Sequence, residues 1–105
     1  MIAHLAGELI AAGETWVVID VGGVGYRVTV TRAAAEALRR TEGAVRLHTK
    51  MIVRDDDILL YGFIHPGELD LFGILITVTG IGPQTAMNIL SRTSLEEFAA
   101  AVVNE

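Results

Sequence analysis

The sequence predicts a small β + α protein, with strands in its N-terminal part and short helices after them. Three observations predict this class. Residues 1–64 contain β-branched and alternating segments, and helical apolar spacing begins at residue 68. Apolar residues make up 51% of the 105-residue chain, which is enough for a packed core. We therefore expect two small units, residues 1–64 and residues 65–105.

Strands are expected at residues 2–11, 15–21, 24–31, 44–53 and 58–63. The pair Gly22-Gly23 separates the second strand from the third and predicts a hairpin. Tyr26, Val28 and Val30 alternate with polar residues and should share one face. Residues 32–40 are rich in alanine and favour a helix. Five strands with a helix between the third and the fourth match the order of an OB-type barrel, a fold that commonly binds nucleic acid.

The pattern changes at His65-Pro66-Gly67, which we interpret as the boundary between the two units. Helices are expected at residues 68–79, 83–91 and 94–104. Ser94 and Glu97 have the spacing of a capping box at the start of the third. The buried faces of the first two helices are predicted to consist of Leu69, Phe72 and Ile76, with Leu71 and Leu75 flanking them, and of Ala86, Ile89 and Leu90.

The strongest functional motif joins the first two of these helices. Gly80 and Gly82 permit a sharp bend without bulky side chains, and Pro83 suits the first turn of the helix that follows. Exposed N–H groups at a helix start form an anion site, and a DNA phosphate would fit it. The candidate DNA-binding residues are Thr79, Gly80, Ile81, Gly82, Pro83, Gln84 and Thr85. The alternative is a helix corner whose glycines only permit close packing.

A second motif, Arg54-Asp55-Asp56-Asp57, lies between the last two predicted strands. Aspartate favours turns, so a solvated hairpin tip is one interpretation. The other is an acidic wedge that repels phosphates, by about 1 kcal/mol for each charge pair 4 Å apart in water. Asp55 and Asp56 are the candidates for this role, with Arg54 and Asp57 beside them.

The charge of the chain argues against nucleic acid, since phosphate binding usually requires a basic surface. The formal net charge is −5. Residues 1–64 carry seven Lys/Arg and eight Asp/Glu, whereas residues 65–105 carry one Arg and five Asp/Glu. Main-chain amides offer a partial answer, because they bind phosphate without lysine or arginine.

Other functional classes find little support. Gly22-Gly23-Val24-Gly25 lacks the lysine and the following helix of a phosphate loop. His4, His48 and His65 are scattered, so we expect no metal site, no cofactor and no catalytic group. The chain has no cysteine, which fits a cytoplasmic location. No membrane association is expected, since glycines and a proline interrupt residues 71–91. Trp16 is expected in the core.

Three strings together resemble the RuvA family, over residues 1 to about 103. They are DVGGVGY at residues 20–26, VRDD followed by LLYGF within residues 53–63, and GIGP at residues 80–83. The resemblance implies a helix-hairpin-helix at the glycine bend. It also implies a non-catalytic subunit that binds four-way (Holliday) DNA junctions in recombination and repair. Asp55 and Asp56 would be the acidic pin at the centre of a homotetramer, and two tetramers would be able to enclose one junction.

The chain departs from the family pattern in three respects. A second helix-hairpin-helix and a C-terminal domain that contacts the ATP-driven motor RuvB would lie beyond residue 105, so we expect a truncated form. Gln84 stands where the family usually has a basic residue, which predicts a shallow salt dependence. The rival hypothesis is an OB-type protein-interaction module without DNA binding, and the net charge supports it.

Overall fold

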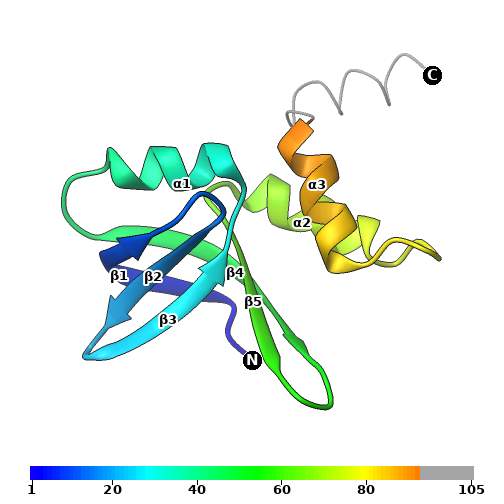
Figure 1. The fold of residues 1–105 in the computed structure, drawn as a ribbon, viewed down its shortest axis with the longest axis horizontal. Coiled ribbons are helices and arrows are strands. Elements are labelled where there is room, and N and C mark those ends of the chain that lie inside the picture. The colour runs from blue at the N-terminus through cyan, green and yellow to red at the C-terminus, as the bar shows by residue number, and fades with distance from the viewer. Residues whose placement is uncertain (93–105) are drawn as a thin grey trace.

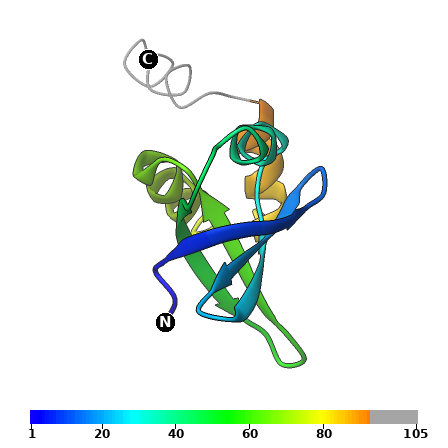
Figure 2. The same cartoon turned by 90° about the vertical axis from the view of Figure 1, so that its left-hand side faces the viewer.

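The computed structural model describes residues 1–92 of the chain. Its first part is a closed five-stranded barrel with the strand order β1-β2-β3-β5-β4. Each strand begins and ends within three residues of the expected position: β1 is His4–Ala12, β2 Trp16–Val21, β3 Val24–Thr29, β4 Val45–Val53 and β5 Ile58–Phe63. The prediction of an OB-type barrel is confirmed, and Figures 1 and 2 show its strands from two sides.

The register of the strands explains how the barrel closes. β1 pairs with β4 through its first residues and with β2 through its last, and a bulge between Leu9 and Ala11 interrupts the pairing with β2. Gly22 and Gly23 have φ angles of 59° and 93° and form the predicted hairpin between β2 and β3. β3 meets β5 in parallel at Thr29 and Tyr61, and this pairing completes the cylinder.

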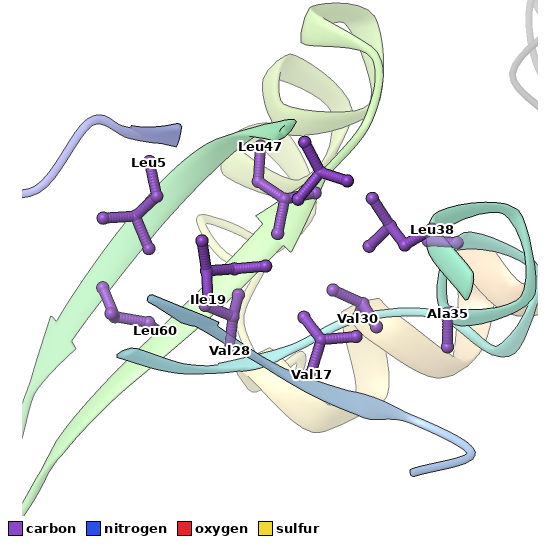
Figure 3. Packing of buried hydrophobic residues seen from close by; sticks show 11 residues of the cluster. Leu5, Val17, Ile19, Val28, Val30, Ala35, Leu38, Leu47 and Leu60 are labelled. Carbon is purple, nitrogen blue, oxygen red and sulfur yellow. The ribbon is translucent and has the colours of Figure 1, made fainter. Parts of the chain in front are cut away.

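Helix α1 (Arg32–Arg39) packs against one end of the barrel. Thr31 begins it, because its hydroxyl oxygen accepts a hydrogen bond from the Ala34 N–H at 3.1 Å. Figure 3 shows Ala35 and Leu38 turned from this helix toward the aliphatic side chains of the strands. The barrel core consists mainly of Leu5, Val17, Ile19, Val28, Val30, Leu47 and Leu60.

Trp16 does not belong to this core, contrary to the sequence prediction. Its ring lies half-buried on the outside of the barrel, and the Arg27 guanidinium lies 4.7 Å from the ring centroid. The side chain of Val17, the next residue, points inward instead. The alternation of β2 therefore places the largest ring of this strand outside, where a cation covers it.

Two further helices pack on the outer face of β5. Helix α2 (Pro66–Leu75) and helix α3 (Pro83–Arg92) share a second hydrophobic cluster with Tyr61 and Phe63. The Phe72 ring is fully buried there, with its centroid 5.2 Å from that of Tyr61 and 5.1 Å from that of Phe63. Aromatic pairs at this distance add about 0.5–1.5 kcal/mol each beyond the burial of their area. The helical part is thus attached directly to the barrel.

Helix α2 differs from its predicted range of residues 68–79. It begins at Pro66, which suits a first helical position, and its cap at Ile76 opens a run of four β-branched residues that disfavour helix. The N–H groups of Thr77 and Val78 instead donate to carbonyls three residues earlier, each at 3.1 Å. The helix therefore tightens and ends before the glycine bend.

The buried faces of α2 and α3 are also displaced from the prediction. Leu71 and Phe72 are the buried residues of α2, whereas Leu69 and Ile76 are only half-buried. In α3, Met87 is buried with Ala86 and Leu90 while Ile89 is half-buried. The predicted helix at residues 94–104, with its capping box, lies outside the described residues. No helix within residues 1–92 is long and apolar enough to cross a membrane.

Candidate nucleic-acid interface

The bend between α2 and α3 lies on the surface. Gly80 has a φ of 90°, in the left-handed region that favours glycine, and it turns the chain toward α3. Gly80 and Gly82 are exposed, as are Thr79, Gln84 and Thr85, while Ile81 and Pro83 are half-buried. Ile81 packs against the cluster that joins the two helices. The bend is therefore anchored from inside and open on its outer side.

The N–H groups of the bend are only partly occupied. The Ile81 N–H donates to the Val78 carbonyl at 3.1 Å, and the first helical bond of α3 runs from the Ala86 N–H to the Gly82 carbonyl at 3.0 Å. Within residues 1–92, no acceptor binds the N–H groups of Gly82, Gln84 and Thr85. Three donors thus remain at the positive end of α3, where an anion is stabilised.

Among the described residues, the space beside the Gly82 backbone is open. A Cβ atom placed on Gly82 would meet nothing within 4 Å, and the φ of this residue lies outside the left-handed region. Neither packing nor backbone conformation within the described chain therefore requires glycine at this position. A ligand that approaches the backbone closely would require it, since a side chain would fill that space.

The Gln84 side chain is already engaged. Its Nε2 donates to the Asn88 Oδ1 at 3.2 Å, one helical turn further along α3. The sequence placed Gln84 among the candidate DNA-binding residues, and its contact with DNA stays a prediction. The geometry leaves the main-chain N–H of Gln84 as the donor without a partner inside the described chain.

The acidic motif forms the tip of the β4–β5 hairpin. The Arg54 N–H donates to the Asp57 carbonyl at 2.8 Å, which closes the loop, and all four residues from Arg54 to Asp57 are exposed. None of the three aspartates forms a salt bridge within residues 1–92. Figures 1 and 2 show this hairpin extending well away from the barrel. The tip therefore presents unneutralised carboxylates to whatever approaches the hairpin.

The electric field of the tip reaches back to Tyr61. Burial raises the pKa of the Tyr61 hydroxyl, Arg54 opposes this rise and Asp57 adds to it. The phenol is consequently neutral near pH 7 and serves as an apolar wall beside Phe72. The acidic tip lies at the far end of the β4–β5 hairpin, whereas the glycine bend joins α2 and α3 (Figure 1). The two features therefore do not form one compact site.

The other motifs form no ligand site among the described residues. In the Gly22-Gly23 turn, the Gly23 N–H donates a hydrogen bond to the Asp20 carboxylate at 2.9 Å, so this N–H is already occupied within the turn. The barrel register places His4 opposite His48, a proximity that their sequence positions did not predict. No group of three or more potential metal ligands occurs within residues 1–92.

The apolar flanks of the hairpin tip were not among the predicted functional residues. Val53 and Ile58 are paired across the hairpin, and their exposed fractions are 65% and 63%. Both were predicted only as strand residues. The sequence did hold a signal for their exposure, because both lie directly beside the four polar residues of the tip, and strand ends at such a tip extend away from the core.

Both parts of the chain are similar to known protein families. The family model described as the RuvA N-terminal domain matches residues 1–62, and one described as a SAM-like helix-hairpin-helix tandem matches residues 72–105. A protein from Symbiobacterium thermophilum is 49% identical over the whole chain, which covers 51% of that protein. One from Syntrophotalea carbinolica is 45% identical over 97% of the chain, which again covers 51% of the relative. Both are named Holliday junction branch migration complex subunit RuvA. The chain thus spans about half the length of these relatives.

Proposed function

Because the chain belongs to the RuvA family, we propose that it binds four-way DNA junctions as a non-catalytic subunit of a branch-migration complex. In this role it holds the junction, while an ATP-driven motor supplies the work. The relatives carry a name that refers to this complex, and they are about twice as long as the chain. We assign no contact with the motor RuvB to any residue of this chain.

The observation that carries the proposal is the set of N–H groups at Gly82, Gln84 and Thr85 that have no acceptor within residues 1–92. They point from an exposed bend at the start of a ten-residue helix, and Gly82 leaves space for a close approach. Such a site binds the phosphates of a duplex arm independently of base sequence. It also explains how a chain with a net charge of −5 can hold DNA.

The acidic tip supplies the preference for junctions over duplex. We assign Asp55 and Asp56 the role of a pin that repels phosphates, so a continuous duplex cannot cross the centre of the complex. In a four-fold symmetric tetramer the pins of all subunits meet at one point, which multiplies the repulsion there. An open junction leaves that point free of stacked duplex, and it escapes most of the penalty. Two such tetramers would enclose a junction from both sides.

A binding comparison tests the proposal. The chain is titrated onto a labelled four-way junction and onto a linear duplex of the same sequence, each at a low and at a moderate salt concentration. We expect tighter binding to the junction, and a salt dependence shallower than that of a lysine-rich binder, because amides without net charge make the contacts. Equal or absent binding to both DNAs would refute the proposal and favour the protein-interaction module.

A further inference from the structure

The β4–β5 hairpin exposes two large aliphatic side chains beside its acidic tip. Val53 and Ile58 are direct partners across the two strands, so their side chains lie on the same face. More than 60% of the surface of each is exposed. Each is therefore available to a ligand that reaches the tip.

This face is the outward continuation of the barrel core. Leu47 and Leu60 of the same two strands belong to the buried cluster, and Met51 packs against it. The neighbouring strands end before the tip: β1 pairs with β4 only as far as His48, and β3 meets β5 at Tyr61 alone. The side chains of the hairpin that face the barrel core near its base thus continue outward past the last pairing with β1 and β3. Val53 and Ile58 are the outermost of these side chains, and no other strand covers them.

The charge beside this pair restricts what can cover it. Asp55 follows Val53 by two residues and Asp57 precedes Ile58 directly, and neither carboxylate has a salt-bridge partner within the described chain. Phosphates are repelled at this place. The faces of the bases carry no net charge and are largely apolar, and they are accessible only where the stack of a duplex is interrupted. A four-way junction has such interruptions at its crossover.

We propose, on the basis of the junction-binding function above, that Val53 and Ile58 pack against exposed base faces at the crossover. The carboxylates exclude the sugar-phosphate strand, and the aliphatic pair stabilises the unstacked bases that remain. The tip then acts by two opposite effects at one place, repulsion of phosphates and attraction of bases. Apolar side chains that occupy an interrupted base stack are a known means of holding DNA open.

The test compares two matched double variants of the chain. The first is Val53→Thr with Ile58→Thr, since threonine keeps the branched shape and the strand preference while it adds a hydroxyl. The control is Val24→Thr with Ile10→Thr, which makes the same two changes at barrel positions with exposed fractions of 54% and 58%. The probe is a four-way junction with 2-aminopurine at the crossover, whose emission rises when the base unstacks. A linear duplex with an internal 2-aminopurine is the second DNA.

We expect the unaltered chain and the control to raise the crossover emission about twofold or more. The hairpin variant should lose at least half of that rise. Its junction affinity should fall about tenfold, with duplex affinity unchanged, because only the junction offers base faces.

Junction binding and emission equal to those of the control would overturn the inference and leave the proposed function standing. A lower mass in light scattering for the hairpin variant alone would also overturn it, because a second copy of the chain would then cover the pair. Failure of the unaltered chain to bind the junction would refute the proposed function, and the inference with it.

Discussion

Replacing Gly82 with glutamate is the sharpest perturbation of the glycine bend. The substitution adds a carboxylate next to the N–H groups of Gln84 and Thr85, which have no acceptor in the described part of the chain. The structure predicts little effect on folding, since the new Cβ meets nothing within 4 Å and the backbone there is not left-handed. A negative charge at a helix start is even mildly favourable, by about 0.3–1 kcal/mol.

The effect on DNA binding should be much larger than the effect on stability. A carboxylate 4 Å from a phosphate costs about 1 kcal/mol in water and about 4 kcal/mol near a protein surface. It also competes with the phosphate for the same donors. Since about 1.4 kcal/mol corresponds to a tenfold change, we expect junction affinity to fall by at least tenfold. Fluorescence anisotropy with a labelled junction measures the loss, and urea denaturation checks that stability stays within about 1 kcal/mol.

Gly73→Glu is the matched control. A Cβ on Gly73, within α2, also meets nothing within 4 Å, and the change adds the same charge to the helical part. It should leave junction affinity within about twofold, because Gly73 belongs to α2 and not to the start of α3, so its carboxylate does not compete for the same donors. If Gly82→Glu bound the junction as tightly as Gly73→Glu does, the reasoning from bare amides would be wrong.

Three further predictions concern the pin, the bend and the buried phenol. Asp55→Asn with Asp56→Asn should raise duplex affinity relative to junction affinity by about tenfold, and an unchanged ratio in a gel-shift assay would count against the pin. Gly80→Ala should destabilise the chain by about 1–2 kcal/mol in thermal unfolding, because its φ is 90°, whereas Gly82→Ala should be nearly neutral; equal losses would contradict the backbone geometry. Burial raises the pKa of Tyr61 above its usual 10.0, so the folded state holds this proton more tightly than the unfolded state. The stability from this shift is complete below pH 10 and is lost as the pH rises through the higher pKa of the folded state, and Tyr61→Phe should weaken that alkaline loss in unfolding scans from pH 8 to pH 12.

Local patterns in the sequence predicted the barrel well. Alternation over residues 24–31 placed Val28 and Val30 inside, and the pair Gly22-Gly23 marked the hairpin before them, because these signals depend on neighbours in the chain. The end of α2 was predicted too late, since apolar spacing continues through Ile76 although β-branched residues end the helix there. The position of Trp16 depended on which face of β2 turned inward, and packing around the whole barrel decides that.

The candidate site was predictable as a motif and not as a set of donors. The spacing of Gly80, Gly82 and Pro83 indicated the bend, but only the coordinates separate the Ile81 N–H, which is bonded, from those that are unpaired. The exposure of Val53 and Ile58 likewise follows from where β1 and β3 end. The point at which a neighbouring strand stops covering the hairpin depends on the register between strands that are distant in sequence, and no local pattern encodes that register.

The central claim is that main-chain amides at the glycine bend hold the DNA. Amide chemical shifts of the ¹⁵N-labelled chain, recorded during titration with a four-way junction, test it most directly. We predict that the N–H resonances of Gly82, Gln84 and Thr85 move furthest and that the resonance of the Ile81 N–H, which is already bonded to Val78, moves less. Saturable binding in which these three resonances stay in place, while those of the barrel strands move, would contradict it.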